Sequence, residues 1–122
     1  MQAQGDRGLP VEQHFEKING SPQYLGTIQS TGTNIISNLT SAIKNGYKLM
    51  VQPDAAGYIL GADNASTPTT TNSSTTGVKL AADEKYYICL KSDSAYGSPD
   101  GEGWLQWISA SGTTNLKVWR LA

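Results

Sequence analysis

The chain has 122 residues, of which 16% are charged, and its formal net charge is −1. This length is enough for one domain with its own core and too short for two. The nine Lys and Arg residues are scattered singly, so the charge pattern does not favour nucleic acid, and no apolar run is long enough to cross a membrane. We therefore expect neither nucleic acid nor a membrane as a partner.

Residues 1–20 are expected to form an N-terminal arm or a short helix. Val11, Phe15 and Ile18 recur at the i, i+4 and i+7 spacing of one helix face, but two turns are too short to be stable alone. Two interpretations stay open: a frayed tail, or an arm that orders only against a neighbour with Phe15 as its anchor. The start of the chain has neither the basic nor the apolar region of a signal peptide, so synthesis in the cytoplasm is expected.

From residue 21 onward the sequence reads as short strands separated by turn residues. One stretch, "NLTSAIKNG", favours a single helical turn, with Asn38 or Thr40 as its cap. Seven or eight short strands without a long helical pattern predict one all-β domain over residues 21–122, an antiparallel β-sandwich or jelly roll. The strand candidates are "QYLGTIQS", "GTNIIS", "YKLMVQ", "GYILG", "GVKLA", "KYYICLK", "WLQWIS" and "NLKVWRL".

Two stretches are expected to be exposed, mobile loops: the Ser/Thr-rich residues 63–77 and the Gly/Pro/Asp-rich residues 92–103. The second loop holds three carboxylates that are candidates for calcium, although their spacing matches no known calcium loop. These residues are Asp93, Asp100 and Glu102.

Residues with catalytic chemistry are few. Cys89 lies in the apolar run "YYICL" and is expected to be a buried small hydrophobe, and the lone histidine, His14, lies in the polar N-terminal segment. No pair of nucleophile and base, no zinc ligand set and no phosphate-binding loop is present in the sequence. The chain is therefore predicted not to be an enzyme and to have no catalytic, cofactor or metal residues.

All three tryptophans lie in the final stretch, "GEGWLQWISASGTTNLKVWRLA". If this stretch forms a hairpin whose loop has an even number of residues centred on Ser111 and Gly112, alternation along each strand gives two faces. One face is uniformly apolar and is expected to face the core. Its residues are Leu105, Trp107, Leu116 and Val118.

The other face of this hairpin would place Trp104 opposite Trp119, together with Ile108 and with the polar residues Gln106, Lys117 and Asn115. An odd loop would instead move Trp119 to the core face. Exposed tryptophans among polar neighbours indicate a contact surface, for protein or for sugar, unless the protein's own loops or arm cover them. The residues predicted to bind a partner are Phe15, Trp104, Ile108, Lys117 and Trp119.

The order of these signals resembles that of small β-sandwich structural proteins of tailed bacteriophages, of the head decoration or cement type. The resemblance covers about residues 23–120. It runs from "GTIQSTGTNI" through "NGYKLMVQPDAAGYILGADN" and "TTGVKLAADEKYYICL" to "GWLQWISASGTTNLKVW". Each motif alone is ordinary strand-and-turn chemistry, and the specificity lies in their order.

The resemblance implies a non-enzymatic virion protein, made in the host cytoplasm, that binds the outside of a phage capsid and stabilises it. The expected partners are the major capsid protein or another virion protein, together with further copies of the chain in a homo-oligomer. The aromatic content leaves a second hypothesis, a carbohydrate-binding or tail-fibre (receptor-binding) β-sandwich module. Neither hypothesis involves a cofactor.

Overall fold

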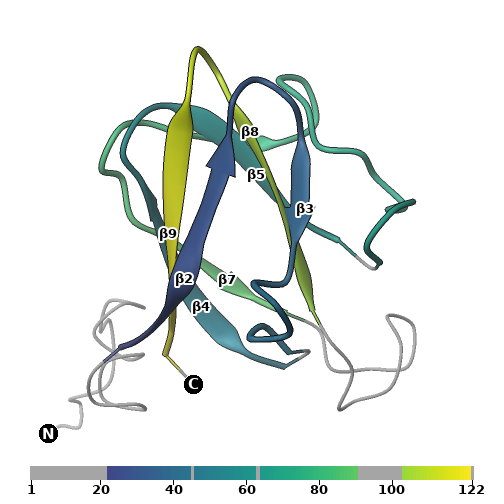
Figure 1. Ribbon diagram of the computed structural model, residues 1–122, viewed down its shortest axis with the longest axis vertical. Helices are drawn as coiled ribbons and strands as arrows, with labels where there is room; N and C mark the ends of the chain where they lie inside the picture. The colour runs from purple at the N-terminus through teal and green to yellow at the C-terminus, as the bar shows by residue number, and fades with distance from the viewer. Residues whose placement is uncertain (1–21, 45, 63, 91–102, 122) are drawn as a thin grey trace, which may run out of the picture.

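The protein forms two antiparallel four-stranded sheets packed face to face (Figure 1). The computed structural model describes residues 22–44, 46–62, 64–90 and 103–121. The first sheet has the strand order β2-β9-β4-β7 and the second the order β3-β8-β5-β6. The strands are β2 (Gln23–Ser30), β3 (Ile35–Ser37), β4 (Lys48–Pro53), β5 (Gly57–Ala62), β6 (Val78–Leu80), β7 (Tyr86–Cys89), β8 (Trp104–Ser109) and β9 (Thr114–Arg120).

The prediction of an all-β sandwich is confirmed. Each central strand alternates between a side chain that faces the opposite sheet and one that faces outward, which is the pattern of a sheet buried on one face. In β4, for example, Leu49 and Val51 are fully buried while Met50 between them is partly exposed. The expected arm at residues 1–20 and most of the loop at 92–103 lie outside the described residues.

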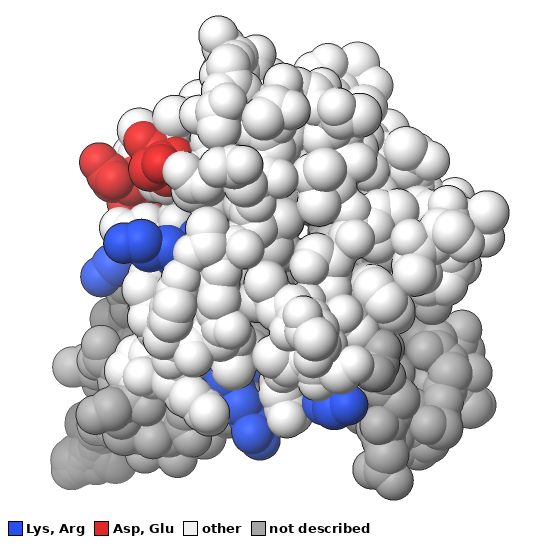
Figure 2. Space-filling view, viewed as in Figure 1, with Lys and Arg blue, Asp and Glu red and all other residues white. Residues whose placement is uncertain are grey.

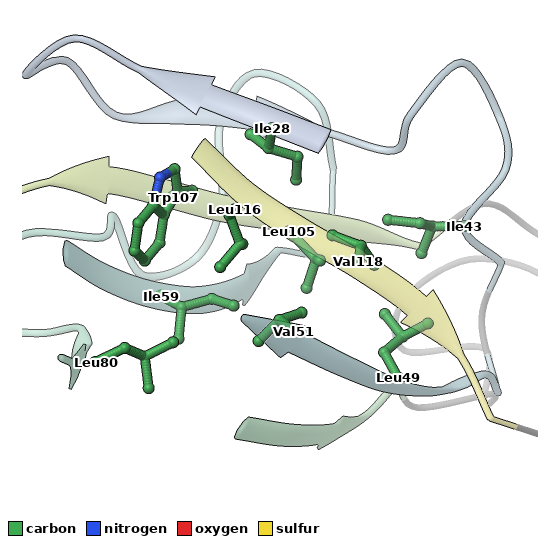
Figure 3. Packing of buried hydrophobic residues seen from close by; sticks show 10 residues of the cluster. All are labelled: Ile28, Ile43, Leu49, Val51, Ile59, Leu80, Leu105, Trp107, Leu116 and Val118. Atoms are coloured by element: carbon green, nitrogen blue, oxygen red, sulfur yellow. The ribbon is translucent and has the colours of Figure 1, made fainter. Parts of the chain in front are cut away.

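The core lies between the two sheets, and Trp107 is its largest side chain (Figure 3). Its indole Nε1–H donates a hydrogen bond of 3.0 Å to Thr114 Oγ1, which joins β8 of one sheet to β9 of the other. The ring lies directly against Gly57, where an added Cβ would be 2.4 Å from Cη2 of the indole. The fully buried residues Leu105, Trp107, Leu116 and Val118 confirm the predicted core face.

The predicted hairpin between the last two strands is wrong. β8 pairs with β3 and β5, whereas β9 pairs with β2 and β4, so the chain crosses from one sheet to the other after Ser109. The turn is fixed by the Ser109 hydroxyl, which donates to the Gly112 carbonyl at 2.6 Å, and by Gly112 at a φ of 66°. This crossing lets both apolar inner faces bury each other, which one two-stranded hairpin could not do.

The stretch expected to form a helical turn forms a left-handed turn instead. Leu39, Thr40 and Ser41 all have positive φ, at 55°, 58° and 68°. Of the two expected caps, Asn38 and Thr40, Asn38 caps this turn: its Oδ1 accepts a hydrogen bond from the Ser41 N–H at 3.1 Å. Each such residue costs about 1–2 kcal/mol relative to a right-handed conformation, and burial of the following Ile43, which is 0% exposed, helps to offset that cost.

The Ser/Thr-rich loop is held against the outer face of the second sheet by Gln106. The Nε2 group of Gln106 donates to the carbonyls of Gly61 and Thr70, both at 2.9 Å. Its Oε1 accepts from Asn34 Nδ2 at 3.0 Å and from the Asn72 backbone N–H at 2.9 Å. Gln106 is therefore fully buried although its side chain points away from the core, and the loop covers part of this face.

Candidate functional site on the outer face of the first sheet

Four large side chains form a row across the outer face of the first sheet. Cross-strand register places Tyr24 of β2 opposite Trp119 of β9, Trp119 opposite Met50 of β4, and Met50 opposite Tyr87 of β7. Each of the four has a sequence neighbour in or against the core, namely Leu25, Val118, Leu49 and Ile88, so the alternation of the strands turns these four side chains outward. We call Tyr24, Trp119, Met50 and Tyr87 the outer row.

The members of the outer row are neighbours, because the Cβ atoms of residues opposite each other on paired strands lie only about 4.5–5.5 Å apart. The rings of Tyr24 and Trp119 meet edge to face, with centroids 5.7 Å apart and planes at 60°. Tyr24 is 52% exposed, and the other three side chains are partly buried. The Tyr24 hydroxyl forms a hydrogen bond with the hydroxyl of Thr27, which holds the ring over the sheet.

Lysines flank the outer row on both sides. Lys48 lies two residues from Met50 on β4, and Lys117 lies two residues from Trp119 on β9. Because β4 and β9 run antiparallel, the two lysines lie on opposite sides of the row. The row is thus an apolar strip with a cation at either side.

Cys89 also lies on this outer face, opposite Lys48, and it is exposed. The expectation that it is buried is wrong. In β7 the inward positions are taken by Tyr86 and Ile88, which pack against the core, so the alternation of the strand turns Tyr87 and Cys89 outward.

Beyond Lys117 the same face becomes polar. The Asp54 carboxylate accepts hydrogen bonds from the Asn115 backbone N–H at 2.8 Å and from Asn115 Nδ2 at 3.0 Å. The backbone hydrogen bond from Asn115, followed by the side-chain one, lowers the pKa of Asp54 below its ordinary value. In the view of Figure 2, acidic side chains gather at one side of the molecule, directly above basic ones, and most of the described surface in this view is uncharged.

The structure divides the residues that were predicted to form one contact surface. Trp119 and Lys117 lie on the face that carries the outer row. Trp104 and Ile108 lie on the outer face of the second sheet, so the predicted Trp104–Trp119 cross-strand pair is wrong. Phe15 lies outside the described residues. Partner binding by any of the five stays a prediction.

Sequence reasoning missed three of the four residues of the outer row, namely Tyr24, Met50 and Tyr87. The alternation within "YKLMVQ" and "KYYICLK" already separates Met50 and Tyr87 from the apolar inward positions. The missing information was which strands are neighbours, because only pairing with β9 brings these side chains beside Trp119.

Comparison with protein-family models, with curated proteins and with solved structures gave no match. Within the described ranges, no three His, Cys, Asp or Glu side chains are grouped so that they could hold a metal ion. The calcium candidates Asp93, Asp100 and Glu102 lie outside those ranges. In the part of the chain that the structure describes, no helix is long and apolar enough to span a membrane.

Proposed function

We propose that this chain is a non-enzymatic virion structural protein that binds the outside of a phage capsid and stabilises it, as a decoration or cement protein. Its partner is the major capsid protein or another virion protein, and it acts as a homo-oligomer. Its site of action is the capsid surface, after synthesis in the host cytoplasm. Its mechanism is binding alone.

The observation that carries this proposal is the outer row. Tyrosine and tryptophan dominate the binding energy of protein interfaces, and methionine adapts its shape to a partner. The row crosses all four strands, a span of about 14 Å at roughly 4.8 Å per strand. A flat apolar strip of this kind, with lysines beside it, suits contact with another protein surface better than it suits catalysis.

Binding of this kind stabilises a shell by mass action. A protein that binds the assembled lattice and not the free subunits shifts the equilibrium toward the assembled state. Because a lattice repeats the same site, several linked copies act together, and modest affinity at each site is sufficient. This is why a homo-oligomer is part of the proposal.

Co-sedimentation with purified, expanded capsid shells tests the proposal. We expect the wild-type protein to sediment with the shells and the double variant Tyr24→Ser, Met50→Ser to lose most of that binding. Trp104→Ser is the matched control, because Trp104 is a partly buried aromatic residue on the opposite outer face. Thermal melting confirms that each variant is folded. A wild-type protein that stays in the supernatant with shells contradicts the proposal.

A second candidate, a carbohydrate-binding or tail-fibre (receptor-binding) module, is favoured by one specific observation. The outer row contains three aromatic rings, and the amide of Gln52 lies on the same face near the row. Sugars bind to proteins through such combinations of apolar ring surface and hydrogen-bonding groups. Titration of tryptophan fluorescence with a panel of oligosaccharides tests it, and an unchanged signal across the panel argues against it.

A further inference from the structure

The edge of the first sheet at β2 is long and carries no charge. β2 has 8 residues, and its sequence "QYLGTIQS" contains neither a charged residue nor proline. Among the described strands it pairs only with β9, so its other side is an open edge (Figure 1). An open edge is a template for pairing with another chain, and proteins commonly guard it with lysine, proline or a very short strand. In β2 only a bulge between Tyr24 and Gly26 interrupts the first half, and the second half is regular.

The hydrogen bonds of β9 show which backbone groups of β2 point to the open edge. The N–H of Asn115 donates to the Asp54 carboxylate at 2.8 Å, and its C=O accepts from the Asp54 N–H at 3.0 Å. Both groups therefore point toward the end of β4 and away from β2. In an antiparallel pair, two opposite residues exchange both hydrogen bonds or neither. Gln29 lies opposite Asn115, so its N–H and C=O point to the open edge, and those of Thr27, two residues earlier, do so as well.

The surroundings of β2 agree with this assignment. Pro53, which has no N–H, lies opposite Leu116, so Leu116 directs its own backbone groups toward β2 and its partner there, Ile28. Thr27 and Gln29 are exposed, and the described chain has no backbone hydrogen bond to β2 outside the ladder with β9.

The other edge strands offer less to a partner. β3 and β6 have 3 residues each, and β6 contains Lys79. β7 has 4 residues and directly follows Lys85. Short strands and lysines are the usual protections of a sheet edge. β2 is therefore the least protected edge of the described chain.

We propose that β2 pairs antiparallel with β2 of a second copy, so that the two first sheets join into one sheet with four strands from each copy. A two-fold axis beside Ile28 places Thr27 opposite Gln29 of the second copy, and Gln29 opposite Thr27 of the second copy. Each of these two pairs exchanges two backbone hydrogen bonds through the groups that point to the open edge. Opposite residues share a face of the sheet, so both exposed side chains stay on the outer face and the buried Ile28 stays on the core side.

A second copy fits this edge because β2 is complementary to itself. The two-fold axis places the hydroxyl of Thr27 beside the amide of Gln29 at both ends of the pairing, and such polar cross-strand pairs stabilise sheets. No charge on β2 repels the same strand. Lys117, on the neighbouring strand β9, would lie three strands from its counterpart, about 14 Å at roughly 4.8 Å per strand. That distance exceeds the Debye length of about 8 Å, so the two cations repel each other only weakly.

The pairing brings two outer rows onto one surface. Because the two-fold axis is perpendicular to the joined sheet, the outer rows of both copies lie on the same face of it. A single pair of strands buries less surface than a standard stable interface, so the dimer is weak on its own. On a repeating shell both rows can bind together, and such linkage strengthens binding without any new contact. The pairing specifies how copies of the proposed homo-oligomer associate, and in that respect it rests on the proposed function.

Disulfide formation tests the register directly. In a Cys89→Ser background, which removes the exposed native thiol, Thr27→Cys and Gln29→Cys are introduced separately, mixed in equal amounts and oxidised. Opposite residues of a hydrogen-bonded pair have Cα atoms about 5.5 Å apart, within disulfide range, whereas the same residue of the two copies lies on a diagonal, at about 7–8 Å. We expect the mixed disulfide dimer to exceed each homodimer about tenfold, where random pairing gives about twofold. Lys79→Cys, at an exposed position on the edge strand β6, is the control and is expected to stay largely monomeric.

Sedimentation equilibrium with two variants of Gln29 tests the backbone hydrogen bonds. Gln29→Pro removes an N–H that β9 does not use, and proline is tolerated where the N–H of an edge strand faces solvent. Gln29→Ala is the matched control, because it removes the same side chain and keeps the N–H. We expect Gln29→Ala to dimerise within about threefold of the wild-type affinity and Gln29→Pro about tenfold or more weakly, since each copy loses one hydrogen bond to the other. Thermal melting shows that both variants are folded.

Three outcomes would overturn the strand pairing. They are a wild-type protein that stays monomeric at millimolar concentration, mixed disulfides no more abundant than random pairing gives, and a Gln29→Pro variant that dimerises as Gln29→Ala does. Shell binding is measured separately. A dimer that does not bind shells contradicts only binding to the capsid, and a monomer that binds them contradicts only the strand pairing.

Discussion

Truncation of Trp107 tests how far the fold depends on one side chain shared by the two sheets. Trp107 is 0% exposed, and its Nε1–H bonds Thr114 across the core. Trp→Ala in a packed core costs about 3–5 kcal/mol. The Thr114 hydroxyl adds to that cost, because it stays buried and loses its hydrogen-bond partner. Since about 1 kcal/mol shifts the melting temperature of a domain of this size by roughly 4 °C, we expect Trp107→Ala to lower it by about 12–20 °C.

Denaturant unfolding followed by circular dichroism measures this cost, with Trp104→Ala as the matched control. Trp104 is only partly buried, on the outer face of the second sheet. Its truncation removes less apolar contact and is expected to cost roughly 1–2 kcal/mol. The variant Thr114→Val separates the hydrogen bond from packing, because it removes the acceptor and keeps nearly the same side-chain volume. Equal destabilisation by Trp104→Ala and Trp107→Ala would refute the assignment of Trp107 to the core and Trp104 to a surface.

Three further predictions concern packing, pH and the anchored loop. Gly57→Ala should destabilise strongly in thermal melts, because the new Cβ would lie 2.4 Å from the Trp107 ring. The pKa of Asp54 is lower in the folded protein than its unfolded value, near 3.8. The stability that this difference contributes is fully present above the unfolded pKa and is lost as pH falls through the lower folded pKa. Asp54→Asn should therefore weaken the dependence of the unfolding free energy on pH between pH 5 and 2, measured by urea titration. Gln106→Ala leaves four hydrogen-bonding groups without their partner, so it should cost roughly 3 kcal/mol or more and should speed proteolysis of the Ser/Thr-rich loop.

The strands and the core were predictable because both depend on local alternation. Leu105 and Trp107 in one strand and Leu116 and Val118 in the next occupy alternate positions, and all four are fully buried. This pattern requires only that each strand has one apolar face, which the sequence displays directly. It holds even though the predicted hairpin between these strands is wrong.

The pairing of strands was not predictable, because it is decided by contacts between distant segments. The turn at Gly112 has the residues of a hairpin, yet the strands on either side separate into different sheets. Ser30, the last residue of β2 and 79 residues earlier in the chain, accepts a hydrogen bond from the Ser109 N–H at 3.0 Å and helps to fix this crossing. The sequence of the turn around Gly112 does not indicate that Ser30 lies beside it.

One error and one open alternative have the same origin. Cys89 was expected to be buried because its neighbours are apolar, but the parity of an edge strand turns it outward. Gln106 was placed on the mixed face of the last two strands, where exposure and cover by the protein's own loops both stayed open, and a loop that begins more than 40 residues earlier covers it. In both cases the type of residue was a weaker guide than its position relative to strands and loops elsewhere in the chain.

The two outer faces would impose different costs on a partner, and this difference favours the face with the outer row. On the second sheet, a partner that reached Gln106 would have to break hydrogen bonds that are already satisfied, at about 1–3 kcal/mol for each buried group left unpaired. On the first sheet, covering Tyr24 removes mainly ring surface from water, which is favourable at about 25 cal/mol per Å². A tryptophan by itself is therefore a poor marker of a contact surface. Trp119 is the better candidate for such a surface because three large side chains from neighbouring strands extend it, whereas Trp104 lies beside a loop that the protein already holds in place.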